Sequence, residues 1–226
     1  MQMARVKQKT PAQAQRYKLT AAIRDRGEKG TNIWLVRPPF QTRDLFLSSD
    51  PQFEAFYLLE GEPAFREIRY LSQWYDVQPV EQLWRPLRQF AVVTTVDDQE
   101  LSVELAFEAE SPKGSAAASL RPFEGVVRVN VDMLNQHIQR IENWRRIIPC
   151  IRRVRLHATA AVERQIAIFL HKKGRITLRN LHGHFSDVDV GIFYGAIATL
   201  LRKRELCADL DTRPWSLNTC VWNAEV

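Results

Sequence analysis

The sequence predicts a two-part protein, with a mixed α/β domain first and a mostly helical domain after it. Short segments in which apolar and polar residues alternate, the pattern of half-buried strands, recur in the first part of the chain. Later segments repeat apolar residues at helical spacing, and between residues 140 and 204 Lys and Arg greatly outnumber Asp and Glu. We place the boundary near 150–158 and therefore assign 16–155 to the first domain and 156–226 to the second.

The composition is that of an ordinary folded protein. Of the 226 residues, 45% are hydrophobic and 26% are charged, which is enough apolar mass for a sizeable core. The net charge of +6 permits a polyanionic partner without identifying one. Cys150, Cys207 and Cys220 are odd in number and widely spaced, which argues against a disulfide framework and against a zinc site. This cysteine pattern fits a reducing cytoplasm best, so we expect a cytoplasmic protein. No apolar run approaches the roughly 18 residues of a membrane span, so we expect no membrane partner.

The N-terminal region begins with residues 1–15, which are polar and basic and are expected to form a flexible arm. Segments 32–36 and 42–47 are predicted strands, and a pair of prolines between them ends the first. Ser49, followed by a proline in the first turn, predicts the start of a helix that ends at Gly61.

The central region has the pattern of a sheet followed by a long helix. Asp97-Asp98 predicts a hairpin turn between two of the strands. Asp132 is predicted to open an amphipathic helix that ends near Pro149. The predicted strands are 65–75, 83–96, 101–107 and 126–131.

The C-terminal region has three helical patterns followed by two short strand-like pieces within 206–222. The first helix is predicted over 157–172 and the short second helix over 177–184. Ser186 is predicted to begin the third, in a capping box with Asp189. Three helices, the middle one short, followed by a hairpin are the plan of a winged helix. The predicted buried face of the third helix is Phe193, Ile197, Leu200 and Leu201.

Clustered cations in this region are candidate phosphate contacts. A helix-turn-helix places a helix in the major groove while its basic flanks contact phosphate. Arg202, Lys203 and Arg204 end the third helix, where cations favour the helix dipole, so a structural reason is sufficient for them. Winged helices also dock on proteins, and both interpretations stay open. The best phosphate candidates are Lys172, Lys173, Arg175 and Arg179.

Over residues 40–222 the order of predicted elements resembles TnsA, the endonuclease subunit of heteromeric cut-and-paste transposases. The resemblance implies a restriction-endonuclease-like core followed by a winged-helix domain. The resemblance rests on five segments that follow one another in the same order as in that family. They are Ser49-Asp-Pro-Gln52 with Leu59-Glu60 at the helix end, the strand in 65–79, Arg88-Gln-Phe-Ala-Val92, the strand in 100–106, and the strand and helix in 126–144.

The catalytic positions of that family fall on Gln52, Gln89, Glu104 and Ala106. Active members have carboxylates at the metal site and a lysine beside them, and Mg²⁺ requires hard, anionic oxygen ligands. Gln is a poor substitute for a carboxylate, and Ala106 cannot orient the attacking water as the lysine would. Glu104 is the one surviving acid, so we expect no metal site, no cofactor and a core that is a pseudonuclease.

Three functional hypotheses follow. The first is a DNA-binding and assembly subunit in transposition or recombination; the resemblance implies DNA, a transposase or recombinase subunit and an AAA ATPase regulator as its partners. The second is an active Mg²⁺-dependent endonuclease that cuts transposon ends, with its site rebuilt from neighbours such as Glu54, Glu108 or Lys113. The third is a stand-alone winged-helix DNA-binding regulator.

Overall fold

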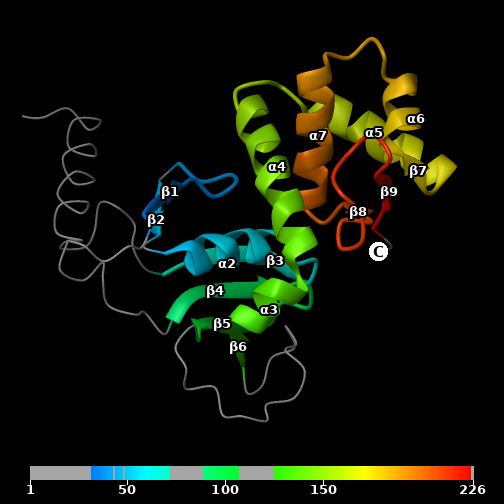
Figure 1. Ribbon diagram of the computed structural model, residues 1–226. Coiled ribbons are helices and arrows are strands. Elements are labelled where there is room, and N and C mark those ends of the chain that lie inside the picture. Colours follow the sequence, from blue (N-terminus) through cyan, green and yellow to red (C-terminus); the bar gives the residue numbers. More distant parts are fainter. Residues whose placement is uncertain (1–31, 43, 48, 72–88, 107–124, 225–226) are drawn as a thin grey trace, which may run out of the picture.

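A computed structural model of the protein describes residues 32–42, 44–47, 49–71, 89–106 and 125–224. This part of the chain is mixed α/β, with three β-sheets and six helices (Figure 1). The arm expected at 1–15 lies outside the described residues. Within the described ranges, no helix has both the length and the apolar character needed to cross a membrane.

The largest sheet consists of β3 (Phe65–Tyr70), β4 (Gln89–Thr95), β5 (Glu100–Leu105) and β6 (Val126–Val129), in that order. The first three strands pair antiparallel, and β5 pairs parallel with β6, so the sheet is mixed. Asp98 has a φ of 60° in the turn between β4 and β5, which confirms the predicted hairpin.

A two-stranded hairpin, β1 (Trp34–Val36) and β2 (Leu45–Leu47), and the helix α2 (Asp50–Gly61) precede this sheet. Ser49 caps α2 as predicted, because its side chain accepts a hydrogen bond from the N–H of Gln52 at 3.3 Å. α2 lies across the inner face of the sheet, where the ring of Phe56 packs against Tyr70 (Figure 1).

Two helices, α3 (Val131–Gln136) and α4 (Ile138–Val154), occupy the place of the single long helix that was predicted. Asn130 rather than Asp132 begins the first of them, because its side chain accepts a hydrogen bond from the N–H of Met133 at 2.9 Å. Pro149 lies inside α4 and does not end it. Buried isoleucines flank this proline, so tertiary packing offsets the hydrogen bond that it cannot donate; they are Ile147, Ile148 and Ile151.

The three predicted C-terminal helices are present as α5 (Ala160–Lys173), α6 (Leu178–His184) and α7 (Val190–Arg202). The predicted capping box is wrong in its first residue, since Asp189 itself caps α7. The Asp189 carboxylate accepts hydrogen bonds from the N–H groups of Gly191 and Ile192, at 2.8 and 3.1 Å. Ser186 therefore lies before the helix and not at its start.

A small antiparallel sheet completes the C-terminal half. It consists of β7 (Ile176–Thr177), β8 (Leu206–Ala208) and β9 (Cys220–Asn223), in the order β7-β9-β8. The two strand-like pieces predicted within 206–222 correspond to β8 and β9.

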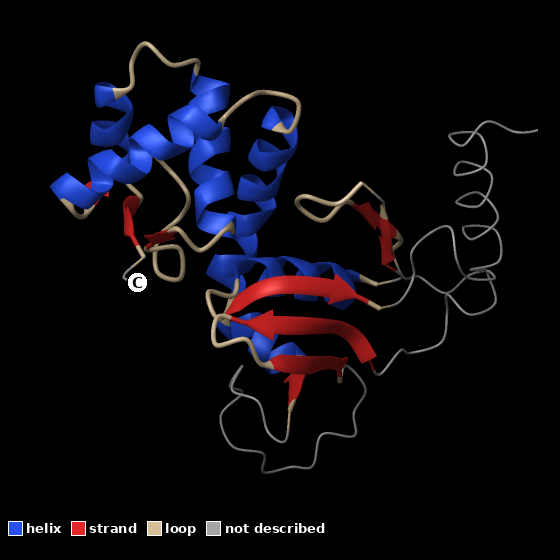
Figure 2. Ribbon diagram, turned by 180° about the vertical axis from the view of Figure 1, so that it is seen from behind, coloured by secondary structure: helices blue, strands red, loops and turns tan. Residues whose placement is uncertain are grey.

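α4 joins the two halves of the molecule. It packs against α2 on one side and against α7 on the other (Figures 1 and 2). Buried residues from the large sheet, α2, α4 and the C-terminal helices form one continuous hydrophobic core. The two halves are therefore packed together through α4.

Candidate functional site

Glu104 and Gln89, two of the predicted site residues, lie directly opposite each other on neighbouring strands. The buried residues of β5 are Leu101 and Val103, so Ser102 and Glu104 point away from the core. The amide of Gln89 donates a hydrogen bond to the hydroxyl of Ser102 at 2.9 Å. On the outer face of the sheet, the Gln89 amide and the Ser102 hydroxyl thus bond to each other, and Glu104 lies on the same face.

The Glu104 carboxylate is paired with a cation, the guanidinium of Arg128. Arg128 lies next to Glu104 in the register of β5 and β6, and its Nε lies 3.4 Å from Glu104 Oε2. The Glu104 side chain is 33% exposed and that of Arg128 is 73% exposed, so solvent screens the pair. The charged group that the structure pairs with Glu104 is therefore a cation.

The other two predicted site residues lie elsewhere on the fold. Ala106 follows β5, on the same side as Glu104, and its N–H donates to the carbonyl oxygen of Val129. Gln52 is buried in the first turn of α2, the helix that packs on the opposite face of the sheet. Among the described residues, no three His, Cys, Asp or Glu side chains gather closely enough to hold a metal ion.

The four predicted phosphate contacts have different environments. Lys172 and Lys173 are exposed at the end of α5, and Arg179 is exposed in α6. Arg175 is also exposed but has partners in the fold: its guanidinium lies 4.5 Å above the ring of Trp222 and 3.5 Å from the Asp209 carboxylate. Arg175 therefore has a structural explanation that the other three lack.

α7, the predicted third helix, is buried over most of its length. Its predicted buried face is confirmed, but residues 195–202 as a whole are buried, because α4, α5 and β8 surround them. Its one cation, Arg202, forms an ion pair with Glu60. In this structure α7 therefore has no exposed basic face to insert into a groove of DNA.

The cations that follow Arg202 also bind within the fold. Lys203 contacts Glu163 at 2.7 Å, and Arg204 donates to the carbonyl oxygens of Glu60 and Phe65 at 3.0 and 3.1 Å. The expectation that a structural role is sufficient for these residues is therefore supported, and the structure adds tertiary partners to the helix dipole.

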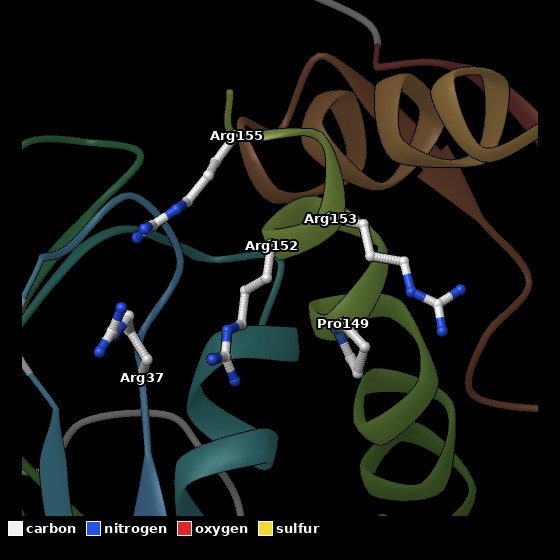
Figure 3. A pocket seen from close by; sticks show the side chains of 5 residues that line it. All are labelled: Arg37, Pro149, Arg152, Arg153 and Arg155. Carbon is white, nitrogen blue, oxygen red and sulfur yellow. The ribbon is translucent and has the colours of Figure 1, made fainter. Parts of the chain in front are cut away.

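Sequence reasoning missed a second basic site, between the β1–β2 hairpin and the C-terminal end of α4. An open cleft of about 340 Å³ lies there. We call it the arginine cleft; it is lined by Arg37, Pro149, Arg152, Arg153 and Arg155 (Figure 3). The run of arginines after Pro149 is visible in the sequence, but its proximity to Arg37 depends on the tertiary fold.

Only one arginine of this cleft is neutralised within the described part of the chain. Arg37 Nε lies 2.6 Å from Oδ1 of Asp44, and this hydrogen bond raises the pKa of Arg37 above its ordinary value. Arg152, Arg153 and Arg155 are exposed and form no ion pair with a described carboxylate. The described lining of the cleft therefore carries a net positive charge.

Comparisons of this chain with protein-family models, with curated proteins and with solved structures found no match in any of the three.

Proposed function

We propose that this protein is a DNA-binding and assembly subunit of a transposition or recombination complex, with a restriction-endonuclease-like core that does not cleave DNA. The observation that carries the proposal is the environment of Glu104. Its cross-strand neighbour is the amide of Gln89, and its charged neighbour is the guanidinium of Arg128.

This environment opposes metal-dependent hydrolysis for two reasons. A divalent ion such as Mg²⁺ needs several anionic oxygens at short, regular distances, and an amide oxygen carries no charge. A guanidinium next to the one carboxylate repels a second cation and competes for the same oxygens. We infer that the strand is kept for its place in the fold, with Glu104 paired to Arg128.

DNA binding is supported by the C-terminal half. Three helices with a β7-β9-β8 sheet fit the winged-helix plan, and Lys172, Lys173 and Arg179 are exposed cations. Because α7 is buried, we expect contacts to phosphate to dominate over contacts to base edges. Binding should then be strongly salt-dependent and weakly sequence-specific.

The assembly role extends the resemblance to TnsA. The expected partners are a transposase or recombinase subunit and an AAA ATPase regulator. Co-purification of the protein with a transposase encoded beside it tests this part. A protein that binds DNA but no such subunit would instead be a stand-alone regulator.

A combined binding and cleavage assay tests the core of the proposal. Fluorescence anisotropy measures binding of a labelled duplex, and gel electrophoresis follows strand cleavage with Mg²⁺ or Mn²⁺. We expect binding that weakens steeply as salt rises, and no cleavage with either ion. Glu104→Ala should leave both results unchanged.

The matched control is Glu100→Ala, which removes an exposed carboxylate from the same strand. Metal-dependent cleavage that disappears in Glu104→Ala and persists in Glu100→Ala would show an active nuclease and refute the proposal. Absence of DNA binding at about 50 mM salt would also refute it, since non-specific affinity is high at low ionic strength.

A further inference from the structure

We propose that the arginine cleft binds the phosphodiester backbone of DNA. The inference rests on the proposed function. It places DNA contacts at a surface outside the C-terminal helices and sheet. The carrying observation is that guanidinium groups from two separate elements line one open cleft.

The side chains converge from both walls of the cleft. Arg37 comes from the β1–β2 hairpin, whereas Arg152 and Arg155 come from the end of α4 and the residue after it. Figure 3 shows these three side chains directed toward the same space, while Arg153 turns to the other side of the helix. The fold thus gathers several cations in a small volume.

Like charges gathered in this way repel one another, and the cost falls when an anion enters. Asp44 is the one described carboxylate that pairs with a lining residue, and it contacts Arg37 through Nε. That contact uses Nε, and among the described residues no hydrogen bond engages the terminal N–H groups of Arg37. Arg152 and Arg155 have no such partner among the described residues.

The helix dipole accounts for part of this arrangement, because cations are favoured in the last turn of a helix. The dipole explains why positions 152 and 153, in the last turn of α4, carry cations such as Arg152 and Arg153. It does not explain why Arg37, on a different element, lies against them. A bound anion would account for the convergence of the two elements, because it would offset the repulsion between their cations.

The chemistry of the lining favours a phosphodiester backbone. A guanidinium donates parallel hydrogen bonds to phosphate oxygens and remains charged at all ordinary pH values. Among the described residues that line the cleft, Pro149 is the one apolar residue, so a small molecule with a large apolar body would find few contacts with them. A repeating, hydrophilic anion such as the DNA backbone fits an open cleft of this kind.

Anisotropy titrations of a labelled duplex of roughly 20 base pairs test the proposal with the full-length protein. Arg152→Gln and Arg155→Gln should each weaken binding by about 3- to 10-fold at moderate salt, with a smaller dependence on salt concentration. Arg164→Gln is the matched control, because Arg164 is exposed on α5, outside the cleft. Circular dichroism confirms that each variant is folded.

The inference is overturned if Arg152→Gln and Arg155→Gln weaken binding no more than Arg164→Gln does. If they retain full affinity while Lys172→Gln and Arg179→Gln lose it, the cleft is not the site and the proposed function still stands. Failure of the unaltered protein to bind the duplex refutes both.

A second probe distinguishes DNA from an acidic protein segment. Labelled oligoglutamate carries repeated carboxylates in place of phosphates. We expect the duplex to bind at least about tenfold more tightly at equal salt. Equal or tighter binding of oligoglutamate, weakened by the same two substitutions, would assign the cleft to an acidic protein and refute the DNA proposal.

Discussion

Arg202 at the end of α7 and Glu60 at the end of α2 form a buried ion pair, with Nε 2.5 Å from Oε2, although 142 residues separate them. Tyr70 donates its hydroxyl to the other carboxylate oxygen at 2.9 Å. Arg204 donates to the backbone carbonyl oxygen of Glu60 at 3.0 Å. Glu60 therefore bonds to both halves of the molecule and holds α7 against the end of α2.

Removing the cation of this pair should be strongly destabilising. Arg202→Met keeps much of the side-chain volume but leaves the Glu60 carboxylate, which is 1% exposed, without its charged partner. We expect the free energy of unfolding to fall by about 3–5 kcal/mol. Urea denaturation followed by tryptophan fluorescence measures the loss.

Two further variants test the cause of that loss. Arg164→Met, at an exposed site, should change stability by less than about 0.5 kcal/mol. The double variant Glu60→Gln with Arg202→Met should recover part of the loss, since the unpaired carboxylate is removed. A loss in Arg202→Met as small as that of the Arg164 variant would argue against the buried pair.

Gly195 marks a close approach of α7 to α4. A methyl group at this position would overlap Cγ1 of Val154, far inside van der Waals contact. We therefore expect Gly195→Ala to destabilise the protein by about 1–3 kcal/mol, even though alanine favours a helix. Thermal denaturation measures the effect.

The comparison for this substitution is Gly183→Ala in α6, where an added methyl group meets nothing within 4 Å. That change should be neutral or slightly stabilising. Combining Gly195→Ala with Val154→Ala should relieve the overlap and lose less stability than the two single losses summed. Additive losses would contradict a direct contact between the two helices.

Asn143, on α4, holds the segment between β8 and β9. Its side-chain amide donates to the carbonyl oxygens of Leu210 and Arg213 at 2.6 and 2.7 Å and accepts from the N–H of Trp215 at 2.7 Å. Asn143→Ala would leave these buried groups unpaired, at a cost of about 2–4 kcal/mol. Hydrogen exchange should become faster at the Trp215 amide, while exchange in β4 changes least. Unchanged protection at Trp215 would contradict this role.

Asp211 should make the stability depend on acid pH. Its two carboxylate oxygens accept hydrogen bonds from Arg140 at 2.5 and 2.8 Å, and these bonds hold the pKa of Asp211 below its ordinary value of 3.8. A carboxylate with a lowered folded-state pKa stabilises the protein above the unfolded value, and this contribution disappears as pH falls through the folded value.

Urea unfolding at several pH values tests this linkage. The stability difference between the unaltered protein and Asp211→Asn should be largest near neutral pH and should shrink below about pH 4. About half of the Asp211 side chain is exposed, so the effect is screened by solvent and salt. Asp97→Asn, in an exposed turn, measures the effect of removing a carboxylate that has no such bonds. A difference that stays constant with pH would contradict the prediction.

Elements with local signals could be predicted from the sequence. Ser49 with the proline after it marks the start of α2, and the hairpin turn at Asp98 follows from turn chemistry in neighbouring residues. The errors came where several local solutions compete. Two residues could cap each of these helices: Asn130 or Asp132 for α3, and Ser186 or Asp189 for α7. In the folded chain, the cap is the residue whose side chain reaches the first free N–H groups of the helix, which is Asn130 in α3 and Asp189 in α7.

The candidate site was less predictable, because its properties depend on which distant residues meet. The pairing of Glu104 with Arg128 follows from the parallel register of β5 and β6, and neither residue carries a signal for it in its own neighbourhood. The same holds for Arg37 and Arg155 in the arginine cleft.

The sequence by itself determined the order of the elements, their mixed α/β character and the presence of an excess of cations. Only the tertiary structure decided which cations are free to bind a ligand. Arg202 forms a buried ion pair with Glu60, whereas Arg152 is exposed at the cleft. The physical reason is that a helix or turn depends on contacts a few residues apart, while the charge of a surface depends on which carboxylates the fold brings within reach.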